Sequence, residues 1–91
     1  MAKQVSLPPK LDTAAAAALR TELENASGDS IAFDAAQVEQ LGAACLEMLL
    51  SAVVLWRKNG QTVSFENVSQ TMADDLGRFG LTPDRLAGYA A

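Results

Sequence analysis

Short segments at three places along the chain either alternate apolar with polar residues or are apolar throughout. These segments cover residues 4–7, 30–33 and 62–65, and their length and composition are typical of strands. After the first segment, Pro8 and Pro9 withhold two backbone N–H donors and so end any hydrogen-bonded ladder. The sequence therefore predicts three short strands.

Helical spacing dominates between these strands. The alanine-rich residues 13–25 follow Asp12, a good N-cap, and predict a first helix. Residues 43–58 predict the longest helix, and a shorter one begins after the capping residue Ser69. The apolar stripe of that shorter helix comprises Met72, Leu76 and Phe79, and a last short helix begins at Thr82-Pro83. Because strands that alternate with helices need crossover connections, we predict an α/β fold with a largely parallel sheet.

The helix predicted over residues 43–58 has two apolar faces, one more than a surface helix needs. The face expected to lie on the sheet comprises Leu46, Leu49, Leu50 and Val53. A narrow polar arc comprises Glu47, Ser51 and Lys58, and a second apolar arc comprises Ala44, Met48, Ala52 and Leu55. Either a neighbouring helix covers the second arc, or the arc docks another protein. If it docks a partner, we expect Ala44, Met48 and Leu55 to make the contacts.

Composition narrows the range of functions. The 91 residues suffice for one domain over residues 1–91, and the absence of histidine excludes histidine-based triads and imidazole-ligated metal sites. Lys and Arg number 7 against 11 Asp and Glu, a net charge of -4, which argues against a nucleic-acid partner. No apolar run is long enough for a membrane span, and the N-terminal residues lack a signal-peptide pattern. We therefore expect a cytoplasmic, non-enzymatic protein without a metal or cofactor.

Few residues are candidates for chemistry. Gly42, Ala43, Ala44 and Cys45 occupy a predicted helix start. Free amide groups there attract anions, and small side chains allow a partner's backbone to approach closely. A nucleotide is the alternative ligand, but the chain has no glycine-rich cradle with a following lysine. Cys45 has no histidine to activate it, and we expect it to be buried and unreactive.

Other polar side chains are expected to have structural roles. Asp34 ends a strand without the further acids and the lysine that magnesium-dependent phosphoryl chemistry needs, so it should serve a turn. Asp74 and Asp75 are expected to be solvated on a helix surface rather than to hold a metal ion. Asn67 and Ser69 are expected to order the turn into the next helix, and a contribution to partner binding stays open for both.

In three segments the chain resembles the STAS domain family, which includes bacterial anti-sigma-factor antagonists. The first segment, Val5 to Asp12, has the family's strand, turn and Leu-Asp helix entry. The second, Ile31 to Leu46, runs from an apolar strand to the turn that opens the signature helix. The third, Asn67 to Leu81, has an Asn-x-Ser helix start and a Gly-Leu ending. The resemblance implies a STAS-type small sandwich, with a mostly parallel sheet of four to five strands and helices packed mainly on one face.

One departure from the family changes the expected regulation. Family antagonists that a serine kinase switches carry Asp-Ser-Ser-Gly or a close variant before the signature helix, where this chain has Gly42-Ala43-Ala44-Cys45. Ala43 stands at the phosphoacceptor place and has no hydroxyl group to modify. The resemblance therefore implies a partner site at this turn, without the phosphoryl switch.

Several partners remain compatible with the resemblance. An anti-sigma factor or its serine kinase is expected first. Residues 41–56 are most similar to stand-alone STAS proteins found with bacterial chemotaxis genes, which implies a chemotaxis histidine kinase as an alternative partner. The remaining alternatives are a STAS subunit of a lipid-transport ABC complex, a homodimer through the second apolar arc of the helix over residues 43–58, and a nucleotide-binding protein.

Overall fold

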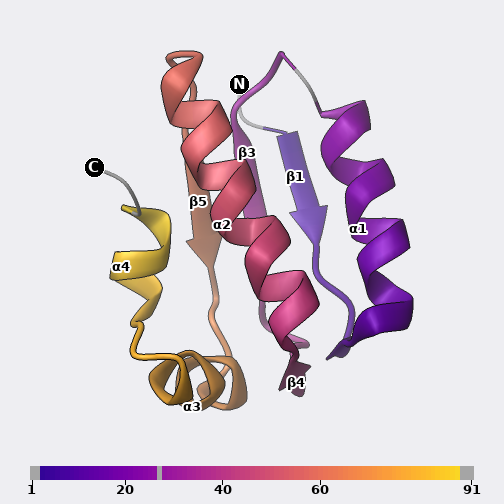
Figure 1. Ribbon diagram of the computed structural model, residues 1–91, viewed down its shortest axis with the longest axis vertical. Helices are drawn as coiled ribbons and strands as arrows, with labels where there is room; N and C mark the ends of the chain where they lie inside the picture. The colour runs from indigo at the N-terminus through magenta and orange to yellow at the C-terminus, as the bar shows by residue number, and fades with distance from the viewer. Residues whose placement is uncertain (1–2, 27, 89–91) are drawn as a thin grey trace.

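The computed structural model describes residues 3–26 and 28–88, in which strands and helices alternate along the chain (Figure 1). The strands are β1 (Lys3–Ser6), β2 (Lys10–Leu11), β3 (Ile31–Asp34), β4 (Gln40–Leu41) and β5 (Val63–Glu66). The helices are α1 (Thr13–Asn25), α2 (Ala43–Lys58), α3 (Gln70–Arg78) and α4 (Pro83–Ala87). All the strands and helices predicted from the hydrophobic pattern are present, and β2 and β4 are additional.

Every strand pair is parallel, and the strands form two sheets. One sheet has the order β1-β3-β5, and the other consists of β2 and β4. In the larger sheet Val5 lies beside Phe33, which lies beside Phe65. The two phenylalanine rings stack with 5.4 Å between their centroids. The predicted α/β class with mostly parallel strands is confirmed, with the five strands divided between two sheets.

In Figure 1, α2 lies in front of the larger sheet, with α1 on one side and α4 on the other. The inner face of α2 buries Leu46, Leu49 and Val53, as the apolar spacing predicts. The prediction that Leu50 belongs to this face is only partly right, because its side chain is half-buried. Leu50 sits at the border of the inner face and lines an open groove on the outer surface of the helix.

Phe79 is a correction to the predicted apolar stripe of α3. The helix buries Met72 and Leu76 but ends before Phe79, whose side chain is exposed. Gly80, at a φ of 77°, turns the chain there. The N–H of Leu81 then donates to the Leu76 carbonyl at 2.9 Å, which closes the end of the helix.

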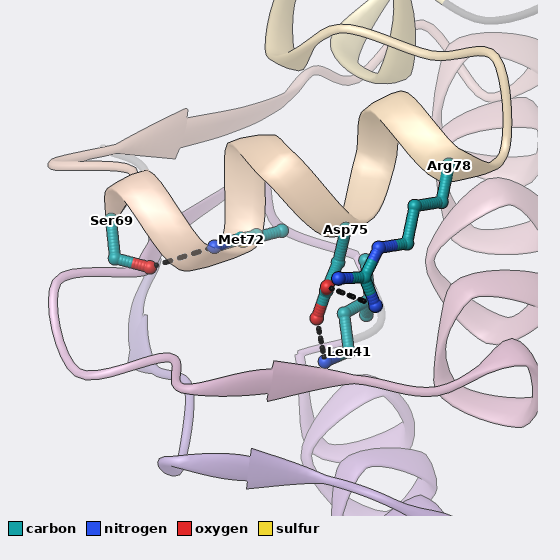
Figure 2. Close-up of polar contacts among 5 residues, drawn as sticks. All are labelled: Leu41, Ser69, Met72, Asp75 and Arg78. Atoms are coloured by element: carbon teal, nitrogen blue, oxygen red, sulfur yellow. Dashed lines mark hydrogen bonds and ion pairs between the residues drawn. The ribbon is translucent and has the colours of Figure 1, made fainter.

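Ser69 fixes the start of α3, as predicted from its position. Its Oγ accepts a hydrogen bond from the backbone N–H of Met72 at 3.1 Å (Figure 2), which is the usual N-cap contact. The same hydroxyl donates to the carbonyl of Val38 at 2.6 Å. Because Val38 lies in the loop that leads into β4, Ser69 holds α3 against that loop.

Asp75 makes a second contact between α3 and β4, which corrects the expectation that it is solvated. Its Oδ2 accepts from the N–H of Leu41 at 2.9 Å (Figure 2), and its side chain is only 14% exposed. Arg78 reaches Asp75 at 3.5 Å but is itself 81% exposed, so this ion pair adds little stability. Asp74 is exposed as expected. Sequence spacing places both carboxylates on α3 but does not show that Asp75 meets a strand.

We predict that Asp75→Ala lowers the free energy of unfolding by about 1–3 kcal/mol, because the half-buried Leu41 N–H loses its acceptor. Asp74→Ala is the matched control and should change stability by less than about 0.5 kcal/mol, since its side chain is exposed. Urea unfolding followed by circular dichroism measures both. Equal losses from the two variants would mean that the Asp75 contact contributes nothing specific.

Candidate docking site at the start of α2

The turn that opens α2 is held by the smaller sheet. Pairing of β2 with β4 sets Leu11 beside Leu41, and the next N–H, that of Gly42, donates to the Leu11 carbonyl at 2.7 Å. A Cβ at Gly42 would lie 3.1 Å from that carbonyl oxygen and 3.8 Å from the Cα of Asp12. Glycine is therefore favoured here by the close approach of two backbones and not by its own φ of -91°.

This contact places the starts of two helices next to each other. Asp12 caps α1, its Oδ1 accepting from the Ala15 N–H at 3.0 Å. Gly42 is the N-cap of α2 and has no side chain with which to cap it. Ala43 and Ala44, the first residues of α2, are exposed. The turn therefore presents a small, open surface, at which Ala43 offers only a methyl group.

Cys45 is buried, which agrees with the expected inert role and corrects its assignment as a partner contact. Its side chain has no exposed surface, and its Sγ–H donates to the Asp12 carbonyl at 3.3 Å. Burial raises the pKa of the Cys45 thiol above its ordinary value, and the negative charge of Asp12 raises it further. The cysteine therefore joins the starts of α1 and α2 from the inside, and its side chain is not available to a partner.

A groove of about 620 Å³ runs between α1 and α2 from this turn. Both helices begin at the same end of the molecule (Figure 1), so the groove lies along both. Its apolar lining comprises Ala16 and Leu23 of α1 and Ala44, Met48, Ala52 and Leu55 of α2. Arg20 and Glu47 are its charged residues on opposite helices.

The second apolar arc of α2 is partly covered by a neighbouring helix and partly open to a partner. Packing of α1 against α2 buries Ala52 and leaves Met48 half-buried, so a neighbouring helix covers part of the arc. Ala44 remains exposed, and Leu55 is 50% exposed. The arc is thus core at its centre and open surface at both ends, and the exposed ends line one groove.

The remaining predicted residues lie on the α3 side of the turn. Asn67 is exposed and has a φ of 53°, a left-handed conformation that asparagine tolerates better than most residues. With the Ser69 cap, it orders the chain between β5 and α3, as predicted. Asp34 also has the expected turn role, because its Oδ1 accepts from the Ala36 N–H at 3.0 Å.

Acidic side chains gather at the end of the molecule where α2 begins. They come from the cap of α1, the carboxyl ends of strands, the following loops, the first two turns of α2, the first turn of α4, and α3: Asp12, Asp34, Glu39, Glu47, Glu66, Asp74, Asp75 and Asp84. Lys10, Arg78 and Arg85 are the basic residues of the same segments. Among residues 3–26 and 28–88, no three acidic or sulfur-containing side chains converge as a metal site would require.

None of the described helices has the length and hydropathy to cross a membrane.

Comparison with protein-family models gives a match over nearly the whole chain. The family model described as Mlab, STAS domain, matches residues 2–86 of the chain. The match therefore includes β1 to β5, the turn at Gly42 and the whole of α2. A search of curated proteins finds no match for the chain.

We predict that Gly42→Ala destabilises the protein by about 1–3 kcal/mol, because the new methyl group meets the Leu11 carbonyl at 3.1 Å within a hydrogen-bonded ladder. Gly77→Ala is the matched control, since a Cβ at Gly77 in α3 meets nothing within 4 Å. It should raise stability by up to about 1 kcal/mol through helix propensity. Thermal unfolding of both variants checks the difference in sign, and a stabilised Gly42→Ala protein would contradict the close-contact argument.

We also predict that Cys45 of the folded protein reacts with iodoacetamide at pH 8 at least about tenfold more slowly than in urea. A raised pKa leaves less thiolate at a given pH, and burial restricts access. Mass spectrometry of alkylated protein over time measures both rates. Labelling of native protein at the unfolded rate would show that the thiol is open to solvent.

Proposed function

Because the chain belongs to the STAS domain family, we propose that it is a non-enzymatic signalling module that resembles anti-sigma-factor antagonists. STAS domains mediate protein–protein interaction, and this one binds a kinase or an anti-sigma factor through the start and outer face of α2. The observation that carries the proposal is the continuity of the exposed turn with the apolar α1–α2 groove.

The residues of the α1–α2 groove and of the start of α2 are of the kinds that bind another protein by apolar burial and close contact. The groove offers apolar side chains for burial, above all Leu55 and Met48. Met48 is unbranched and half-buried, so its side chain can adapt to the shape of a partner. The small residues Ala43 and Ala44 let a partner approach the start of α2 closely. A helix or loop with an apolar face is the partner element that such a groove accommodates.

The charge distribution supports a basic surface on the partner. Acidic residues predominate at the end of the molecule that carries the turn, and opposite charge on a partner would speed association and orient it. This effect would weaken with salt, because exposed charges are screened.

Binding is proposed to be constitutive with respect to serine phosphorylation at the family position. Ala43 has no hydroxyl group, and the hydroxyl of Ser69 is engaged by Val38 and Met72. A serine kinase therefore has no acceptor at the place where it switches other members of the family.

A chemotaxis kinase or a transporter ATPase would use the same surface, so the partner's identity has to come from a binding experiment. Candidate proteins encoded beside the gene can be purified and tested by calorimetry. The variants below then apply to whichever protein binds.

We predict that Leu55→Asp and Met48→Asp each weaken partner binding by at least about tenfold, since each puts a charge into an apolar contact. Ala44→Arg, at an exposed position, should have a similar effect through steric exclusion. Ser64→Asp is the control, because Ser64 is exposed on β5 and lines neither groove of α2. Calorimetry with circular dichroism checks affinity and folding. Unchanged affinity in folded Leu55→Asp and Ala44→Arg proteins would refute the proposed face.

A further inference from the structure

The outer surface of α2 carries a second open groove, next to the one shared with α1. It is lined by Glu47, Leu50, Ser51, Val54, Leu55 and Lys58, whose spacing of three and four residues makes one stripe along the helix. Val54 and Leu55 are 39% and 50% exposed, although both are large apolar residues. One end of the stripe carries an acid and the other end a base.

The order of these residues is self-complementary. If a second α2 is laid antiparallel on the first, with the two-fold axis midway between Ala52 and Val53, positions equidistant from that point face each other. Glu47 then faces Lys58 of the second copy, and Lys58 faces its Glu47. Between these charged pairs, Leu50 faces Leu55, and Ser51 faces Val54.

We propose that this stripe is the interface of a homodimer in which two α2 helices pack antiparallel about a two-fold axis. In a two-fold interface the same surface of each copy makes every contact, so each contact occurs twice. The stripe meets this requirement, because its charged ends pair with each other and its apolar middle pairs with itself. The two copies bury the exposed Val54 and Leu55 side chains. The two Glu47–Lys58 pairs fix the antiparallel direction, since a parallel arrangement would bring like charges together.

The dimer is weak and reversible. The stripe spans twelve residues of one helix, from Glu47 to Lys58, or roughly 17 Å, which is short for a stable interface of about 1,200–2,000 Å². A dissociation constant in the micromolar range or above is expected. Dimerisation therefore depends on protein concentration.

This interface also bears on partner binding, a step that rests on the proposed function. Glu47, Ser51 and Leu55 line both the stripe and the α1–α2 groove. One copy of α2 cannot present these side chains to a second copy and to a partner at once. Self-association therefore competes with partner binding, and a partner releases the monomer.

Sedimentation equilibrium of the purified chain, up to about 500 µM, tests the dimer without any partner. Glu47→Lys alone and Lys58→Glu alone should each raise the dissociation constant at least about tenfold, because either change turns two attractive pairs into two repulsive ones. The double variant Glu47→Lys with Lys58→Glu should regain wild-type association. The two single changes alter net charge in opposite directions, so general charge repulsion cannot explain a loss in both.

Arg57→Glu is the control, because Arg57 is exposed on the same helix but lies outside the stripe. It should leave the dissociation constant within about twofold. A wild-type chain that stays monomeric throughout the concentration range would overturn the proposal, as would single variants that associate normally. A double variant that fails to regain association would overturn the antiparallel register. Failure of the dimer proposal can be told apart from failure of the proposed function, because Ala44 lines the α1–α2 groove and not the stripe. Ala44→Arg therefore tests partner binding without changing the stripe.

Discussion

The carbonyl group of Leu11 is the contact on which the candidate site depends. It accepts the Gly42 N–H at 2.7 Å at the end of the short β2–β4 pair. Because α1 begins directly after Asp12 and α2 directly after Gly42, this one bond sets the starts of both helices side by side. The helices then run from a common end, and the groove between them follows from that placement. The buried Cys45 adds a second link, to the Asp12 carbonyl.

The opposite side of the turn is held by α3. Asp75 accepts the N–H of Leu41, the residue before Gly42, and Ser69 donates to the carbonyl of Val38 in the middle of the same connection. The connection from β3 to α2 is therefore held at two points by polar side chains of α3 and its N-cap. The exposed side chains that follow at the start of α2, Ala43 and Ala44, are small. The turn therefore combines a hydrogen-bonded frame with a surface that another backbone can approach closely.

The sequence predicts those features that depend on a single element. The capping roles of Asp12 and Ser69 and the buried face of α2 follow from local spacing. What it does not predict are contacts between elements that lie far apart in the chain. β2 and β4 have two residues each, too few to show an alternating pattern. Asp75 beside Asp74 looks like any acidic pair until the fold brings Leu41 to one of them, and the partial exposure of Leu50 depends on neighbours that periodicity does not specify.

The helix α2 combines a buried inner face with apolar residues on its outer surface, and the two have different physical causes. Leu49 and Val53 are fixed by the sheet beneath them. Leu55 is half exposed to water, and no packing within the monomer explains a large apolar side chain at that position. It lies where the groove and the self-complementary stripe overlap, so either proposed occupant would remove it from solvent. Because both occupants need the same residue, the two associations are exclusive on geometric grounds, and concentration and partner affinity decide between them.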